Sequence, residues 1–121
     1  MNHPSFTCLD QWAKSVELTN IQNVLDCYAQ SAVLTPTVSN KIRQTPDQIK
    51  DYFESFLSKI DGAVSWDQTI VQEVRPDVVT WAGIYTFQLN SGPFTARFTF
   101  NVKKIGEDWK ILHHHSSGLP E

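Results

Sequence analysis

The sequence is poor in glycine and contains no long apolar run. Its five glycines never form the G-x-G-x-x-G pattern of a dinucleotide site, and no phosphate-binding loop is present. No stretch approaches the roughly 20 apolar residues that a membrane-spanning helix requires, so no membrane partner is expected. The N-terminus has no basic segment followed by an apolar one, and we therefore expect no signal peptide.

Cysteine and clustered positive charge are also scarce. The two cysteines, Cys8 and Cys27, lack C-x-x-C spacing, so we expect buried thiols in a reducing compartment rather than a disulfide. Ten basic residues are scattered among 13 acidic ones, and Lys103 with Lys104 is the only adjacent basic pair. Because a nucleic-acid surface needs a basic stripe, nucleic acid is not expected as a partner. The expected location is the cytoplasm.

What the sequence does contain is the composition of an ordinary soluble protein, with 40% hydrophobic and 19% charged residues. Its 121 residues predict one domain that spans residues 1–121. Apolar residues at helical spacing predict a first helix over residues 7–18 and a second over residues 21–28. Thr7 and Asp10 are predicted to form a capping box on the first helix.

A third helix has the most complete start signal in the chain. Thr45 is the predicted N-cap, Pro46 the first helical residue, and Gln48 the partner that closes a capping box. The apolar stripe behind this start continues to Ile60, so Asp61-Gly62 is predicted to end the helix.

The second half of the chain changes to alternating patterns separated by turn residues, which predicts strands. In the clearest of them, Phe98 and Phe100 face one side and Arg97 faces the other. Helices followed by a run of strands indicate an α+β fold, with helices packed on one face of a curved antiparallel sheet. The predicted strands cover residues 32–35, 41–44, 64–74, 78–89, 94–104 and 109–117.

Five groups of residues occur in the order and at the spacing typical of one family. They are Tyr28-Ala29 with Ala32-Val33-Leu34, Pro36-Thr37-Val38-Ser39-Asn40, Tyr52-Phe53 with Phe56-Leu57, Ala96-Arg97-Phe98-Thr99-Phe100, and Trp109-Lys110-Ile111-Leu112-His113-His114-His115-Ser116-Ser117. In these residues the chain resembles bacterial proteins related to the association domain of calcium/calmodulin-dependent protein kinase II. That family belongs to the nuclear transport factor 2-like, or SnoaL-like, superfamily.

The resemblance implies a cone, in which a strongly bent sheet wraps around about three helices and leaves a ligand pocket between them. It also implies a homo-oligomer that buries sheet surface, commonly a dimer. The sequence carries no kinase domain, so no kinase role follows from the family name. The superfamily includes isomerases, cyclases and dehydratases, and fold alone does not choose among them.

Three consecutive histidines in the last predicted strand are the candidate catalytic residues. Strict alternation places His113 and His115 on one face with Ile111, and His114 on the other face with Ser116. The imidazoles could bind a metal, act as acid or base in the pocket, or be satisfied structurally at a pocket rim or subunit interface. No motif at metal-ligand spacing accompanies them, so no metal or cofactor is expected. In the related kinase association domain, an arginine that lines the pocket stands where Ser116 is here, which favours the His114 side.

Further candidates for ligand binding lie elsewhere in the chain. Arg97 is flanked by threonines two positions away, and is either a surface residue or an anchor for a ligand carboxylate. Arg43, which has a similar position in the family, has the same two interpretations. Tyr28 and Tyr52 punctuate apolar helical stripes, either as core residues with the hydroxyl at a polar rim or as ligand contacts. Ser116 completes the predicted ligand-binding set.

Two functions remain open from the sequence. The first is a homo-oligomeric small-molecule-binding domain whose pocket holds an apolar carboxylic acid through Arg97 and histidines. The second is a SnoaL-like enzyme that transfers a proton, with a pocket histidine as general acid or base. The pocket strands offer no evident carboxylate, the usual group for this chemistry in the superfamily, and its absence favours the first function.

Overall fold

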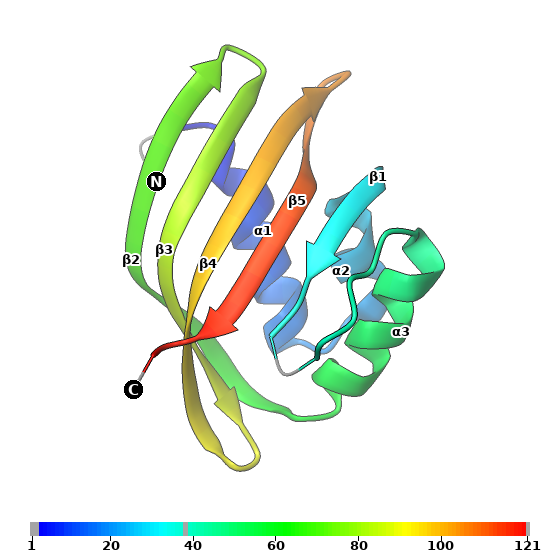
Figure 1. The fold of residues 1–121 in the computed structure, drawn as a ribbon, viewed down its shortest axis with the longest axis vertical. Helices are drawn as coiled ribbons and strands as arrows, with labels where there is room; N and C mark the ends of the chain where they lie inside the picture. Colours follow the sequence, from blue (N-terminus) through cyan, green and yellow to red (C-terminus); the bar gives the residue numbers. More distant parts are fainter. Residues whose placement is uncertain (1–2, 38, 121) are drawn as a thin grey trace.

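The computed structural model describes residues 3–37 and 39–120, and a curved five-stranded sheet forms most of it (Figure 1). Val38, in one of the segments that carry the family resemblance, lies outside the described residues. The elements are α1 (Phe6–Glu17), α2 (Ile21–Asp26), β1 (Tyr28–Thr35), α3 (Pro46–Leu57), β2 (Ile60–Arg75), β3 (Val78–Leu89), β4 (Gly92–Ile105) and β5 (Asp108–Gly118).

The strand order in the sheet is β1-β5-β4-β3-β2. β1 runs parallel to β5, and the other three pairs are antiparallel. Figure 1 shows α1 crossing behind the sheet, with α2 and α3 beside β1. The predicted α+β fold, with helices on one face of a curved sheet, is confirmed. We call the face that the helices cover the inner face, and the opposite face the outer face.

The first helix is held by its apolar side rather than by a cap. α1 begins one residue earlier than predicted, and its N-cap residue Ser5 makes no side-chain cap hydrogen bond. Thr7 therefore lies inside the first turn, where its hydroxyl donates to the Pro4 carbonyl at 2.9 Å. Asp10 pairs instead with Lys14 at 2.9 Å. The predicted Thr7–Asp10 capping box is wrong.

The second helix ends at Asp26, two residues before the predicted end at Tyr28. Its start is capped by Asn20, whose side chain accepts from the Asn23 backbone N–H at 3.1 Å. Tyr28 instead opens β1, because it pairs with Ile111 of the distant last strand. Long-range strand pairing overrides the helical pattern here.

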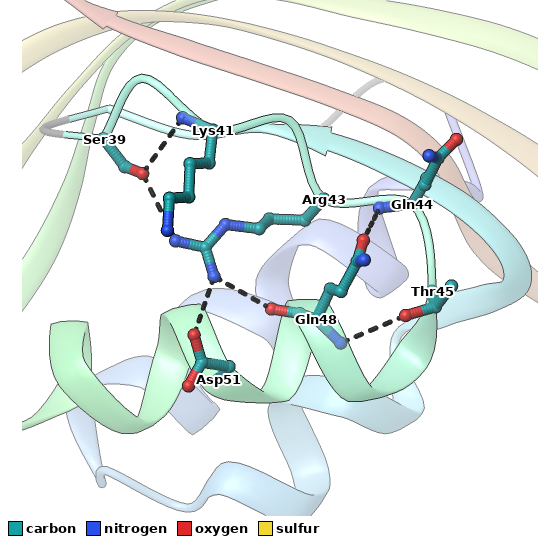
Figure 2. Close-up of polar contacts among 7 residues, drawn as sticks. All are labelled: Ser39, Lys41, Arg43, Gln44, Thr45, Gln48 and Asp51. Carbon is teal, nitrogen blue, oxygen red and sulfur yellow. Dashed lines mark hydrogen bonds and ion pairs between the residues drawn. The ribbon is translucent and has the colours of Figure 1, made fainter.

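The third helix starts as predicted. The Thr45 hydroxyl accepts from the Gln48 backbone N–H at 3.2 Å, and Pro46 is the first helical residue. The Gln48 side chain accepts from the Gln44 backbone N–H at 2.9 Å, one residue before the expected partner (Figure 2). The helix ends at Leu57, and the predicted continuation to Ile60 is wrong because that residue begins β2.

The strand predicted over residues 41–44 is reduced to one bridge. Arg43 exchanges two backbone hydrogen bonds with Leu34, of 2.8 and 2.9 Å. This bridge fixes the backbone from which the Arg43 side chain reaches toward α3. None of the helices in the described residues is long and apolar enough to cross a membrane.

A bulge in β5 decides which side chains point inward. Asn101 of β4 pairs with His113, whereas Val102 pairs with Ile111, so Leu112 is an extra residue on β5. Ile111 and His114 are consequently both buried on the inner face. The strict alternation that grouped Ile111 with His113 and His115 is wrong at this point. One added residue moves every later side chain to the opposite face.

Candidate functional site

The inner face of β5 presents one histidine, His114, to the core. Its ring is 3% exposed, and Phe100 of β4 stacks on it with ring centroids 3.9 Å apart. The Tyr28 hydroxyl lies 2.9 Å from Nδ1, and the Tyr85 hydroxyl lies 3.1 Å from Nε2. Burial lowers the pKa of His114 well below its ordinary value, and His113 and His115 act in the same direction. The imidazole is therefore neutral at physiological pH.

The neighbours of His114 assign a direction to its hydrogen bonds. The Tyr85 hydroxyl donates to Ser116 Oγ at 2.7 Å, so it must accept from the N–H at Nε2 of the neutral ring. Nδ1 then accepts from the Tyr28 hydroxyl, which itself accepts from Trp12 Nε1 at 3.1 Å. The result is one polar chain in which each member donates to the next. Its order is Trp12, Tyr28, His114, Tyr85 and Ser116.

The two tyrosines in this chain remain protonated. Burial raises the pKa of Tyr28 well above its ordinary value, and it also raises that of Tyr85. A neutral imidazole between two protonated phenols satisfies all the buried polar groups without a charge. This series of hydrogen bonds can accordingly keep the buried polar side chains ordered, and it ends at the Ser116 hydroxyl.

The space beside this polar chain is almost filled. The cavity has a volume of about 10 Å³, at the lower limit for a single water molecule. Its walls include Trp12, Tyr52, Phe56, Phe87 and Ser116, and no carboxylate is among the described residues that line it. The interior as it stands has no room for a ligand of several atoms.

A separate cleft lies between α3 and the segment before it, around Arg43 (Figure 2). One terminal nitrogen of Arg43, Nη1, donates to Asp51 Oδ2 at 2.9 Å and to the Gln48 carbonyl at 3.3 Å. The other, Nη2, donates to Ser39 Oγ at 3.3 Å. The Arg43 side chain is 13% exposed, whereas that of Asp51 is 79% exposed. The guanidinium is thus held in a nearly buried position by partners at the surface.

One hydrogen-bond donor of this guanidinium is unused. Arg43 Nε is buried and has no partner among the residues that the structure describes. The guanidinium carbon lies 5.6 Å from the centroid of the Tyr52 ring. The cleft has a volume of about 280 Å³, and Lys59 also contributes to its lining. Arg43 lines the cleft, and an acceptor that reached Nε from there would satisfy this donor.

Two aromatic rings separate this cleft from the interior. Tyr52 and Phe56 line both spaces, and they stack with centroids 5.6 Å apart and planes within 14°. The Tyr52 hydroxyl donates to the Thr37 carbonyl at 3.1 Å, and burial raises the pKa of Tyr52. The predicted residues Arg43, Tyr52 and Ser116 therefore lie in sequence from the surface cleft to the core.

The outer face of the sheet carries the other predicted residues. Arg97 is exposed there, His115 pairs across the strands with Thr99, and His113 pairs with Asn101. Arg97 and His115 border a shallow hollow of about 450 Å³. The sheet separates both from His114 and Ser116. The expectation that Arg97 acts with the histidines on one ligand can thus apply only to the outer-face histidines.

Two members of the inner polar chain were not among the sequence candidates. Tyr85 lies on the buried register of β3, which it shares with Trp81 and Phe87, and this pattern could have identified it. Trp12 is buried in the core, where its Nε1 donates to the Tyr28 hydroxyl. In the described part of the chain, no three or more His, Cys, Asp or Glu side chains are arranged to hold a metal ion.

Comparison with known proteins agrees with the architecture. The family model described as calcium/calmodulin dependent protein kinase II association domain matches residues 5–120. A crystal structure from Xanthomonas campestris described as such an association domain is 37% identical, with a TM-score of 0.89, and the match covers 96% of this chain and 86% of that one. No curated protein sequence matches the chain.

More distant structures share the fold alone. A nuclear transport factor 2-like protein of unknown function from Shewanella oneidensis MR-1 is 18% identical, with a TM-score of 0.78, over 93% of this chain and 94% of that one. A ketosteroid isomerase-like protein from Erwinia carotovora atroseptica is 12% identical, with a TM-score of 0.82, over 97% and 95% of the two chains. These structures agree with the predicted nuclear transport factor 2-like fold.

Proposed function

The chain belongs to the calcium/calmodulin dependent protein kinase II association domain family, and from this premise we propose that it is a homo-oligomeric domain that binds a small apolar carboxylic acid beside Arg43. The observation that carries the proposal is the nearly buried guanidinium with an unused Nε donor at the edge of a cleft. Arg43 replaces Arg97 as the expected anchor, because Arg97 lies exposed on the outer face.

The chemistry of the cleft favours an acid. A guanidinium binds a carboxylate through two parallel N–H donors, and such charge-assisted bonds are about twice as strong as neutral ones. The present partner, Asp51, is largely exposed, so its ion pair contributes little and a ligand carboxylate can compete with it. Lys59 and the hydroxyl of Ser55 add further donors along the same cleft.

The apolar part of the ligand would contact the aromatic wall. Tyr52 and Phe56 present their rings to the cleft, and rotation of these side chains would connect it with the interior. An acid with a compact apolar body would then reach toward the Ser116 hydroxyl. Large acids with charged tails would not fit, because the interior is lined mainly by apolar and aromatic side chains.

The outer face supports the proposed self-association. Ile70 of β2 is 53% exposed and borders the hollow together with Ile84, Arg97 and His115. Exposed apolar side chains rimmed by polar ones are typical of protein interfaces. In this proposal Arg97 and His115 contact a second copy of the chain rather than the ligand.

Proton-transfer catalysis at His114 has less support. Both ring nitrogens are occupied by tyrosine hydroxyls, and the lowered pKa of His114 makes it a weak base. The contacts of His114 in the interior therefore favour a binding domain over an enzyme.

The proposal is tested by thermal shift with a panel of aromatic and branched aliphatic carboxylic acids, and their amides as uncharged controls. An acid at a hundredfold excess over its Kd should stabilise the parent protein by about 2.7 kcal/mol. Arg43→Met should abolish the shift, whereas Arg97→Met, the matched control, should keep it. Arg43→Lys retains the charge but not Nε, so it should bind weakly. Equal stabilisation of Arg43→Met and the parent would show that Arg43 is not the anchor.

A further inference from the structure

Two cysteines from distant positions meet at the base of a cleft on another part of the molecule. Cys8 is in the first turn of α1, and Cys27 joins α2 to β1. Both are free thiols, 6% and 4% exposed. The Cys8 thiol donates to the Cys27 carbonyl, with Sγ 3.8 Å from the oxygen, and the Cys27 thiol donates to the Asn23 carbonyl, with Sγ 3.4 Å from the oxygen. They are therefore adjacent in the folded protein.

The thiols are buried but lie next to solvent. They line a cleft of about 380 Å³ whose other walls come from α1 and from the turn and start of β5. Its rim carries Thr7, Gln11, Asp26, Glu107, Asp108 and Lys110. A small, uncharged and polar molecule can enter such a space, whereas the acidic side chains disfavour anions.

The surroundings make the two thiols unequal. Lys110 Nζ donates to the Asp26 carbonyl at 2.6 Å, which holds its positive charge one residue from Cys27. The neighbouring Cys8 thiol lowers the pKa of the Cys27 thiol, and Lys110 lowers it further, against the effect of burial. For Cys8, the neighbouring Cys27 thiol and burial raise the pKa. Cys27 is the better nucleophile of the pair.

We propose that Cys8 and Cys27 form a peroxide-sensitive thiol pair, in which Cys27 attacks the oxidant and Cys8 closes a disulfide. In the first step the Cys27 thiolate attacks one oxygen of hydrogen peroxide, the O–O bond breaks, and Cys27 sulfenic acid and hydroxide form. In the second step the Cys8 sulfur attacks the Cys27 sulfur, the S–O bond breaks, and the departing hydroxide takes the Cys8 proton and leaves as water. The proton that Cys27 lost on ionising neutralises the hydroxide of the first step. Two thiols and one peroxide thus give one disulfide and two waters.

Oxidation of Cys8 and Cys27 would affect the polar chain in the core. Trp12 lies one helical turn after Cys8 on α1, and Tyr28 follows Cys27 directly in the chain. Trp12 Nε1 donates to the Tyr28 hydroxyl at 3.1 Å, so the two cysteines and this hydrogen bond connect the same pair of segments. A disulfide would add a covalent link there, and tryptophan fluorescence offers a signal for it.

The experiment treats the reduced, folded protein with hydrogen peroxide and follows free thiols and intact mass. The parent should lose both thiols and the mass of two hydrogen atoms, without dimerising, and a dithiol reductant should reverse the change. Cys8→Ser should stop at a sulfenic acid on Cys27 that dimedone traps. Cys27→Ser should react more slowly, because burial still raises the pKa of the remaining Cys8 thiol.

Two results would overturn the proposal. One is survival of both thiols in the folded parent under conditions that oxidise a free cysteine peptide. The other is reaction of Cys8 in Cys27→Ser as fast as that of Cys27 in Cys8→Ser. Lys110→Met should slow oxidation of Cys27 severalfold, and Lys50→Met, which removes an exposed lysine of α3, should not. Equal oxidation rates in these two variants would also contradict the assignment of Cys27 as the attacking thiol.

Discussion

The two faces of the sheet give neighbouring histidines opposite environments. His114 is enclosed between two tyrosines and a phenylalanine on the inner face. His115, the next residue, is exposed on the outer face and contacts the Thr35 hydroxyl at 2.6 Å from Nδ1. The three consecutive histidines resemble a single motif in the sequence. His114 and His115 nevertheless lie on opposite faces of the sheet and contact different residues. The face of the sheet, rather than the run, determines their chemistry.

The largest expected difference between the two faces is in stability. His114→Ala leaves the hydroxyls of Tyr28 and Tyr85 without their shared partner and opens a cavity, so it should cost about 3 kcal/mol of unfolding free energy. His115→Ala on the exposed face should change it by less than about 0.5 kcal/mol. Urea denaturation measures both values. Equal costs for the two variants would contradict the assignment of a buried polar chain.

The next largest difference between the two faces should be in the pH dependence of stability. The lowered pKa of His114 means that the unfolded chain binds a proton below pH 6.5 that the folded chain does not. The contribution of His114 is therefore complete above that pH and is lost as the pH falls, by up to about 1.4 kcal/mol per unit.

Denaturation curves across that pH range compare variants on the two faces. His114→Gln should flatten this part of the profile, and His115→Gln should leave it unchanged. A slope that persists in His114→Gln would assign the acid sensitivity to another group.

Substitution on the outer face should have the smallest effect on the stability of the folded chain. It should instead change the oligomeric state. Ile70→Lys places a charge on the exposed apolar surface and should shift the protein to a monomer in light scattering, with the circular dichroism spectrum retained. Ile42→Lys is the control, because Ile42 is also an exposed isoleucine but lies before α3 rather than on the sheet. A parent protein that is already monomeric at micromolar concentration would contradict the proposed oligomer.

Local signals in the sequence predicted local structure well. Thr45 and Pro46 start α3 because capping depends on residues within one turn. The bounds of β3 were predicted to the residue, since turn residues flank an apolar run on both sides. Tyr28 and Ile60 were misassigned because their strand partners, Ile111 and Leu89, are distant in the sequence.

The candidate site was harder to predict than the fold. Arg43 was found through the family resemblance, but its partner Asp51 and its buried, unused Nε depend on how α3 packs. Which of His114 and His115 points inward depends on one bulge, which no composition or spacing rule located. Tyr85 contributes a hydroxyl from the buried register of β3, where its neighbours Trp81 and Phe87 are core residues.

The bulge at Leu112 affects how histidines should be matched between related chains. Because side chains along a strand alternate between the two faces of the sheet, the bulge changes the face to which every later side chain points. A relative that kept this residue but had no bulge would place the neighbours of its central histidine in the core, while its sequence still showed three histidines in a row. Deleting Leu112, the extra residue, should instead remove the bulge and leave His114 on the inner face, with His113 and His115 on the outer face. Alignments of this family need to fix the bulge first and compare the histidines second.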